Sequence, residues 1–342
     1  MGGLPQKSQA LAGRAAWLIS DGKAGSESQI TGIADGLGLD WALKRVAPTG
    51  LTRLIAPWGR PNTRDRFGAP GGDFAPPFPD IGIAIGRRSM PYLRALKRKH
   101  PETVTIALLD SKAGRGVADL IWVPQHDRLR GDNVVTSLTA PHGFSRERFA
   151  ALRRDPPARL STLPSPRLAI LLGGQNAVYR YTADDHQRFG ACMATLVRHA
   201  GSVLLTPSRR THQALIDTAR AATDGVPRWI YDDEAEPNPY ADFLAHADAI
   251  VVTADSISMT AEAAATGRPV YVFHPARGSV KFTRFHRALE AAGVTRALTP
   301  DVADGGFPAW RPEPRDATAE ICRELEARIV HLDPQLRSRR GS

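Results

Sequence analysis

The sequence has little cysteine and no long apolar run, and each absence excludes a class of protein. Two cysteines in 342 residues are too few for the disulfide framework of a small secreted domain. Cys192 and Cys322 both fall in predicted helices, so we expect small core residues rather than a disulfide or a metal site. No apolar stretch reaches the roughly 18 residues that a membrane-spanning helix needs.

The first residues also lack the marks of a targeting signal. Residues 1–17 contain no apolar segment of the kind that a secretory signal carries. A myristoylation signal has Ser or Thr at position six, where this chain has Gln6. We therefore expect a cytoplasmic protein, with peripheral attachment to the inner membrane left open.

Several catalytic motifs are missing. The chain has no Walker A loop, no H-E-x-x-H metal site and no G-x-S-x-G nucleophile elbow. A short-chain dehydrogenase or sugar epimerase would show G-x-x-G-x-x-G after the first strand and Tyr-x-x-x-Lys, and neither pattern is present. The acidic run Asp232-Asp233-Glu234 resembles a metal clamp only superficially. We therefore predict no obligatory metal or cofactor.

Positive charge is concentrated in the first half of the chain. Residues 1–160 carry 24 Lys and Arg against 14 Asp and Glu, whereas residues 161–342 carry 21 of each. The densest run, 94–100, closely follows Arg87-Arg88. Such a half indicates an anionic partner, namely a membrane surface or a phosphorylated substrate, unless it is only a solvated helix face. Nucleic acid is disfavoured, because no binding module or interleaved aromatic residue accompanies the charge.

Short apolar runs alternate with helical patterns, which predicts an α/β fold of two doubly wound, Rossmann-like domains. In the first half the expected strands are 14–20, 81–86, 103–109 and 120–123, the expected helices are 28–37 and 90–99, and 57–79 is a long loop. In the second half the expected strands are 168–172, 202–206, 229–231, 249–252 and 270–273, and the expected helices include 184–200, 240–246, 257–265 and 317–331.

The segment 251–273 reads as a buried strand, a polar turn, a small-residue helix and a second strand. This βαβ unit places its turn at the carboxyl end of a parallel sheet, where open α/β sheets bind ligands. Ser256, Ser258 and the first helical amides can hold a phosphate at the helix N-terminus. Glu262, one turn further on, can accept hydrogen bonds from a ribose diol. An ordinary βαβ unit with a capped helix explains the same residues equally well.

Other strand-ending turns of the second half have chemistry that suits a nucleoside diphosphate. Glycines allow close approach of the backbone to phosphate, and arginine neutralises pyrophosphate. The candidate ligand-binding residues are Gly173, Gly174, Ser208, Arg209, Arg210, Asp255, Ser256, Ser258, Met259 and Glu262.

A polar turn also follows the first strand, at residues 20–29. Its Asp21 or Glu27 can act as general base for an acceptor hydroxyl, and Lys23 is better suited to stabilising charge. A tight βα turn with structural carboxylates is the alternative, and it is the more frequent case for any one such residue.

These features together describe two α/β domains in a GT-B arrangement. We expect an acceptor- or membrane-facing domain at 1–152, a linker at 153–166, and a nucleotide-sugar-binding domain at 167–314. Residues 315–342 would form a helix that crosses back to the first domain, followed by a tail.

Seven stretches of the chain resemble the bacterial branch of the "elongated mitochondria" family, which is named for a plant mitochondrial-fission factor. The resemblance covers about residues 14–330, and its most specific motifs are EPNPY at 236–240 and TADSISM at 253–259. That family is similar to GT-B glycosyltransferases, including those that make envelope glycolipids. In those enzymes the S-x-x-x-EA segment binds the donor nucleotide and its Glu contacts ribose, a role that would fall to Glu262. Many relatives have His where this chain has Ser26, so a base here would have to be Asp21, Glu27 or another group.

The resemblance implies a glycosyltransferase that uses a nucleotide-sugar donor. Its acceptor would be an anionic or membrane-associated envelope glycolipid, met by the basic first half. A non-catalytic, membrane-associated adaptor like the plant relative is the alternative. A nucleoside-diphosphate-sugar epimerase, a label that members of the family have often carried, ranks third because the motifs named above are missing.

Overall fold

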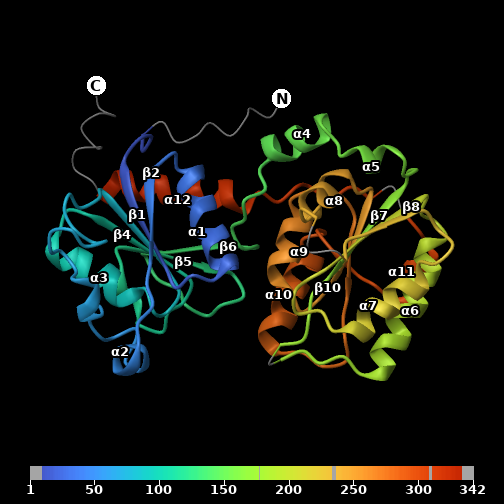
Figure 1. The fold of residues 1–342 in the computed structure, drawn as a ribbon, viewed down its shortest axis with the longest axis horizontal. Helices are drawn as coiled ribbons and strands as arrows, with labels where there is room; N and C mark the ends of the chain where they lie inside the picture. The colour runs from blue at the N-terminus through green and yellow to red at the C-terminus, as the bar shows by residue number, and fades with distance from the viewer. Residues whose placement is uncertain (1–9, 177, 233–235, 308–309, 333–342) are drawn as a thin grey trace. The chain divides into compact units, whose positions relative to one another are not determined.

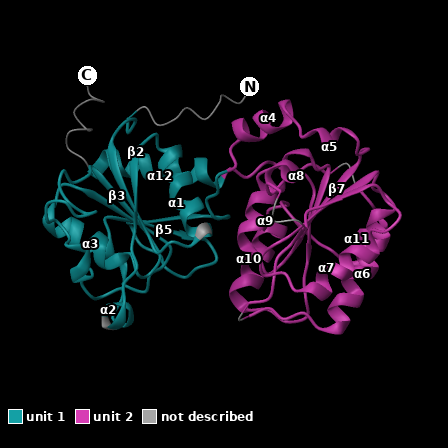
Figure 2. Cartoon of the chain, viewed as in Figure 1, with its two compact units in different colours: residues 1–143, 317–342 teal, residues 144–316 magenta. Residues whose placement is uncertain are grey.

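The computed structural model describes residues 10–176, 178–232, 236–307 and 310–332, and the chain divides into two compact units (Figures 1 and 2). Unit 1 comprises residues 1–143 and 317–342, and unit 2 comprises residues 144–316. Asp233 and Glu234 of the acidic run lie outside the described residues. Each unit contains one six-stranded parallel sheet with helices on both faces, which confirms the predicted fold class.

In unit 1 the strands lie in the order β2-β1-β3-β4-β5-β6, so the order reverses between β1 and β3. A ligand is expected at such a switch point, beyond the carboxyl ends of the strands. The strands are β1 (Ala15–Ser20), β2 (Asp40–Arg45), β3 (Ile81–Ile85), β4 (Val104–Leu108), β5 (Leu120–Pro124) and β6 (Val134–Ser137). The helices are α1 (Ala24–Gly36), α2 (Gly50–Leu54), α3 (Met90–Lys99) and α12 (Ala317–Leu332), with short 3-10 turns at Thr63–Asp65 and Arg115–Val117.

Alternate residues of the unit 1 strands enter two cores. Leu18 and Ile83 pack with α1 and α12, whereas Ile19 and Ala84 pack with α3 on the other face. Because both faces are covered, β3, β4 and β5 are continuous apolar runs, which made them easy to predict. The edge strand β2 reads DWALKR and is largely exposed, so it gave no such signal.

The boundary between the units falls after Gly143 rather than at residue 152. Phe144 and Phe149 stack with ring centroids 5.4 Å apart and belong to the core of unit 2. The expected linker 153–166 is in part helical, and its Leu160 and Leu163 are buried in the same core. The sequence predicts a linker here because the stretch is rich in Pro and Arg. Leu160 and Leu163 are buried because residues distant in the sequence pack against them, which the local pattern does not reveal.

In unit 2 the order is β9-β8-β7-β10-β11-β12, which is the 3-2-1-4-5-6 arrangement of dinucleotide-binding sheets. The order reverses between β7 and β10. The strands are β7 (Arg167–Leu172), β8 (Ser202–Pro207), β9 (Arg228–Ile230), β10 (Ala249–Thr253), β11 (Val270–Phe273) and β12 (Arg296–Ala297). The helices are α4 (Arg146–Arg154), α5 (Ala158–Ser161), α6 (Ala183–Val197), α7 (Gln213–Ala222), α8 (Tyr240–His246), α9 (Ile257–Ala264), α10 (Val280–Ala291) and α11 (Pro300–Asp304).

Local signals explain where several of these helices begin and end. A capping box between Thr182 and Asp185 starts α6. Ser256 caps α9, and Gly267 follows the end of that helix with φ of +67°, a conformation that favours glycine. Cys192 in α6 and Cys322 in α12 are buried in the hydrophobic cores of their units, as expected. Within the described part of the chain, no helix combines the length and the apolarity needed to cross a bilayer.

Candidate functional site

The switch point of unit 2 is closed by hydrogen bonds between the turns that follow β7 and β10. The Gly173 N–H donates to Thr253 Oγ1 at 2.8 Å, and the Gly174 N–H donates to Asp255 Oδ2 at 2.7 Å. The two neighbouring strand ends are thus tied together at the edge where a ligand is expected.

Asp255 is the centre of this connection. Its side chain is buried, and Oδ1 accepts a hydrogen bond of 2.6 Å from the Tyr181 hydroxyl. Burial raises the pKa of this carboxyl, while the hydrogen bonds that it accepts act in the opposite direction. Both oxygens are engaged inside the protein, so the geometry gives Asp255 a structural role rather than the ligand contact that we predicted.

The two glycines have a packing reason that the sequence did not reveal. A Cβ on Gly173 would lie 2.1 Å from Asp255 Oδ2, and one on Gly174 would lie 2.1 Å from the carbonyl oxygen of Arg210. No side chain fits at either position. Because their amides already bond to Thr253 and Asp255, these glycines shape the edge instead of offering their N–H groups to a phosphate.

The turn after β8 joins the same edge. Thr211 Oγ1 donates to the Gly173 carbonyl at 2.6 Å and accepts from the Ser208 N–H at 2.8 Å. Arg209 and Arg210 are exposed, and no ion pair of either side chain occurs among the described residues. The turn that carries these two arginines is thus hydrogen-bonded to the β7 turn at this edge.

Helix α9 begins at this edge as well. Ser256 Oγ accepts a hydrogen bond of 3.3 Å from the Met259 N–H and so caps the helix. The Ser258 hydroxyl is exposed in the first turn. The cap uses one amide of the turn, and Ser258 remains as a donor that faces solvent.

Glu262 lies one turn further along α9 and is partly buried. Its Oε2 accepts a hydrogen bond from the Tyr240 hydroxyl at the start of α8. Burial raises the pKa of Glu262 to about 7, although Tyr240 and the charge of Arg148 favour the ionised form. The EPNPY motif thus ends on the residue that positions this carboxyl.

The turn of unit 1 places Asp21 at the other switch point, between β1 and β3. The Asp21 side chain is 3% exposed, and Oδ2 forms an ion pair of 2.9 Å with Lys23. Oδ1 is buried and has no hydrogen-bond partner in the described chain. A Cβ on Gly86, which follows β3 with φ of +84°, would lie 3.6 Å from that oxygen.

Glu27 has different surroundings. Arg45 donates to both of its oxygens, at 2.8 and 2.9 Å, and this pair lowers the pKa of Glu27. A carboxylate held in this way is a weak base. The sequence did not distinguish Asp21 from Glu27 as a candidate base, but their partners do. Both oxygens of Glu27 accept from Arg45, whereas Oδ1 of Asp21 has no hydrogen-bond partner in the described chain.

Sequence reasoning missed a basic pocket at the carboxyl end of β11. It has a volume of about 550 Å³ and is lined in part by Tyr179, His274, Arg277, Arg284 and Arg287. Arg277 comes from a loop, and Arg284 and Arg287 come from one face of α10. No sequence motif joins them, so the sequence did not predict the pocket. Burial raises the pKa of Tyr179 to about 12, and the negative charge of Asp255 contributes.

Comparisons with known proteins identify related sequences and similar folds. A family model described as "Mitochondrial fission ELM1" matches residues 24–329. The Mitochondrial fission protein ELM1 of Arabidopsis thaliana is 29% identical over 283 residues, which cover 73% of this chain and 65% of the plant protein. The match thus spans less than two thirds of the plant protein.

Solved structures share the fold at low sequence identity. A putative UDP-N-acetylglucosamine 2-epimerase from Listeria monocytogenes has a TM-score of 0.56 at 12% identity, covering 94% of this chain and 97% of its own. The spinosyn forosaminyltransferase SpnP has a TM-score of 0.53 at 12% identity, covering 96% and 100%. The GT-B-like fold is therefore shared by a sugar transferase and a sugar epimerase.

Proposed function

We propose a glycosyl-transfer function for this chain, which belongs to the Mitochondrial fission ELM1 family. A nucleotide sugar would bind at the carboxyl edge of the unit 2 sheet. The main support is the switch point itself. There the β7 turn is hydrogen-bonded to both the β8 and the β10 turn, and Ser258 in the first turn of α9 is exposed. The acceptor would be an anionic or membrane-associated envelope glycolipid that meets the basic unit 1.

The donor groups can be assigned individually. The amides of the first turn of α9 and Ser258 would bind a phosphate, with Arg209 and Arg210 neutralising the diphosphate. Glu262, oriented by Tyr240, would accept hydrogen bonds from the ribose. Arginine side chains, rather than a metal ion, would stabilise the charge of the departing nucleoside diphosphate.

Asp21 would be the general base that removes the proton from the acceptor hydroxyl. Its unused Oδ1 supports this assignment, and the Arg45 pair argues against Glu27. Lys23 would hold the other oxygen of Asp21 through their ion pair. Transfer then requires one proton to pass to Oδ1 as the new glycosidic bond forms and the nucleoside diphosphate leaves.

A thermal-shift panel of nucleoside diphosphates and nucleotide sugars tests the donor site. A ligand at about 100 times its Kd stabilises the native state by roughly 2.7 kcal/mol, a readily measured shift. The double variant Ser258→Ala/Glu262→Gln should abolish that shift. Asp242→Asn is the matched control, because Asp242 is a carboxyl of the same unit whose pKa burial also raises. If no nucleotide stabilises the wild type at millimolar concentration, the enzyme proposal fails.

The same panel decides between the proposal and its alternatives. A non-catalytic, membrane-associated adaptor is the first alternative, since the plant relative is a mitochondrial fission protein, and it predicts no nucleotide shift. An epimerase is supported by the Listeria structure. The missing short-chain motifs do not bear on an epimerase of this fold. Proton NMR of the bound sugar nucleotide separates the two reactions, because epimerisation changes the sugar and leaves the diphosphate ester intact.

A further inference from the structure

An apolar turn projects from unit 1 at the end of α2. Leu54, Ile55 and Trp58 are 73, 50 and 61% exposed, and they are three of the five large apolar side chains that stand exposed in the described chain. The Trp58 N–H donates to the Ile55 carbonyl at 2.9 Å, and the intervening Ala56 is buried. The turn is therefore fixed in the fold while its large side chains face solvent.

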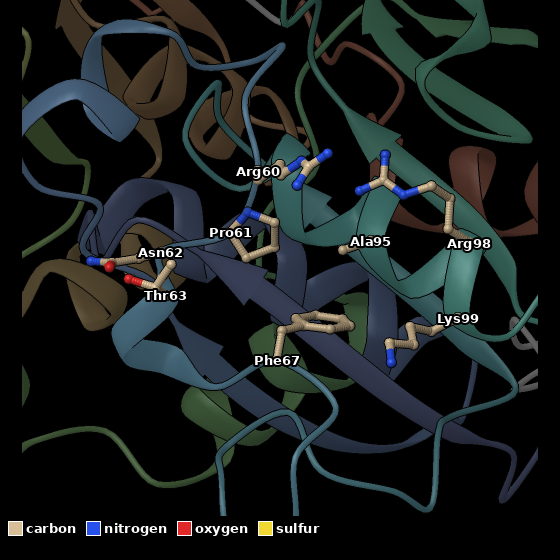
Figure 3. Close-up of a pocket in the computed structure, with 8 residues that line it drawn as sticks. All are labelled: Arg60, Pro61, Asn62, Thr63, Phe67, Ala95, Arg98 and Lys99. Atoms are coloured by element: carbon tan, nitrogen blue, oxygen red, sulfur yellow. The ribbon is translucent and has the colours of Figure 1, made fainter.

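A cationic pocket adjoins this turn. It has a volume of about 480 Å³ and is lined by Arg60, Arg98 and Lys99 together with Phe67 and other residues. Figure 3 shows the guanidinium groups of Arg60 and Arg98 directed toward each other. None of the three cations forms an ion pair within the described part of the chain.

Arg94 connects the turn to the helix that carries the pocket. Its guanidinium donates to the Trp58 carbonyl at 2.9 Å and lies 5.9 Å from the centroid of the Trp58 ring. Arg98 follows one turn later on α3, on the same helix face. Lys97 of the same run instead pairs with Asp119 at 2.8 Å. The apolar turn and the pocket thus form one surface, to which Lys97 does not belong.

The charge of unit 1 is concentrated around this surface. Residues 50–99 contain 10 Lys and Arg against 3 Asp and Glu, a net charge of +7. The whole of unit 1 has 24 against 16, a net charge of +8. Projecting Leu, Ile and Trp beside unpaired cations match a surface that is apolar inside and negatively charged outside. A bilayer with anionic lipids has that profile, whereas a nucleic acid offers no apolar phase for Leu54 and Ile55.

We propose that this surface binds anionic phospholipid bilayers. Leu54, Ile55 and Trp58 enter the boundary between headgroups and acyl chains, where tryptophan is favoured. Arg60, Arg98 and Lys99 hold a lipid phosphate in the pocket. The proposal deepens the acceptor part of the proposed function, since it places unit 1 at the membrane, but it does not require glycosyl transfer.

Co-sedimentation with lipid vesicles tests the surface in the full chain. Vesicles of phosphatidylcholine mixed with phosphatidylglycerol should bind the wild-type protein. Vesicles of phosphatidylcholine alone should bind it at least about tenfold more weakly, because each basic residue near an anionic surface contributes to binding. The variants Leu54→Ser/Ile55→Ser/Trp58→Ser and Arg60→Gln/Arg98→Gln/Lys99→Gln should each weaken binding at least about tenfold. All six side chains lie at an exposed turn or pocket wall, and circular dichroism checks that the variants fold.

The matched control is Val280→Ser/Arg284→Gln/Arg287→Gln in unit 2, which removes an exposed apolar side chain and two arginines from another basic pocket. It should bind vesicles like the wild type. Equal loss in this control, equal binding to neutral vesicles, or no binding at all would overturn the proposal. So would a dimer in sedimentation velocity that the apolar triple variant dissociates, since the turn would then join two copies of the chain.

A donor assay separates this proposal from the proposed function. Both unit 1 triple variants should keep the wild-type thermal shift with nucleotides. Loss of vesicle binding with an intact nucleotide shift supports the surface alone, and failure of both measurements in the wild type overturns both proposals. Displacement of the protein from vesicles by inorganic phosphate at equal ionic strength would show a site for free phosphate instead of a lipid surface.

Discussion

The two units place a buried aspartate at the switch point of the same kind of sheet, and the two carboxylates differ in their partners. Asp255 follows β10 in unit 2, and each of its oxygens accepts a hydrogen bond, from Tyr181 and from Gly174. Asp21 follows β1 in unit 1, and one of its oxygens pairs with Lys23 while the other has no partner in the described chain.

This difference shows that burial alone does not identify a reactive carboxylate. A buried oxygen that accepts a hydrogen bond contributes to stability, whereas one without a donor costs free energy and is retained where a ligand or a proton supplies the missing partner. The comparison therefore favours a structural role for Asp255 and supports the proposal that Asp21 is the general base.

The largest expected effect is on turnover after Asp21→Asn. Loss of a general base lowers the rate about 10²- to 10⁴-fold, and the nucleotide thermal shift of unit 2 should be unchanged. Release of nucleoside diphosphate from the best-binding nucleotide sugar, in the presence of bacterial lipid extract, measures it. Glu27→Gln is the control and should retain turnover within about threefold, because Arg45 already makes Glu27 a weak base. Equal losses in both variants would contradict the distinction.

The next largest effect is on stability, after Gly174→Ala. The added Cβ would meet the Arg210 backbone at 2.1 Å, so we expect a loss of about 3 kcal/mol of unfolding free energy. Gly25→Ala in the unit 1 turn has nothing within 4 Å and lies in α1, where alanine should be neutral or stabilising by about 0.5 kcal/mol. Urea unfolding of both variants checks the contrast. A tolerated Gly174→Ala would mean that the unit 2 edge is not closely packed.

A third prediction concerns the pH dependence of stability, which should have opposite signs for the two glutamates. Glu262 has a folded-state pKa of about 7, raised from 4.5. The stability that it contributes is fully present below pH 4.5 and is lost as the pH rises to about 7. This loss is at most about 3 kcal/mol relative to Glu262→Gln. Glu27 has a lowered pKa, so its contribution is present above the unfolded pKa and is lost as the pH falls through the folded one.

Thermal unfolding of the wild type, Glu262→Gln and Glu27→Gln between pH 3 and pH 8 measures both signs. The advantage of the wild type over Glu262→Gln should decrease with rising pH and become constant above about pH 7. A pH-independent difference would show that the pKa of Glu262 is the same in the folded and unfolded states, which would contradict the prediction.

The smallest effect concerns the cap of α9. Ser256→Ala removes the hydroxyl that accepts from the Met259 N–H, and it should cost about 1 kcal/mol. Ser258→Ala removes an exposed hydroxyl and should change stability by less than about 0.5 kcal/mol while it weakens nucleotide binding. Calorimetry with and without nucleotide separates the two serines. If Ser258→Ala leaves binding unchanged, the α9 turn is a capped helix start and nothing more.

The sequence predicted the two sheets well because their central strands are buried on both faces and therefore read as unbroken apolar runs. It failed for β2, whose edge position leaves polar side chains exposed, and for α4 and α5, whose basic faces hid the buried Phe149 and Leu160. Because a linker and a solvent-exposed helix have similar compositions, the sequence predicted the domain boundary at residue 152 instead of after Gly143.

At the candidate site the sequence identified the right turns but not the use of each residue. Gly173 and Gly174 looked like phosphate-binding glycines, yet the atoms that require glycine belong to Asp255 and Arg210, which are distant in sequence. The difference between Asp21 and Glu27 depends on Arg45, from a strand that the sequence did not predict. The roles therefore became distinguishable only when partners from other elements were known.

The helix α12 has a consequence for the order in which this chain can fold during synthesis. Ile321, Leu325 and Ile329 complete a core formed with α1 and the sheet of unit 1, and they are translated after all of unit 2. Unit 2 is continuous in sequence and can close while the ribosome is still at work. Unit 1, although its strands are made before unit 2, keeps apolar surface exposed until residues 317–332 emerge. A chain that ends before residue 317 should therefore retain a folded unit 2, while unit 1 becomes a substrate for chaperones and proteases.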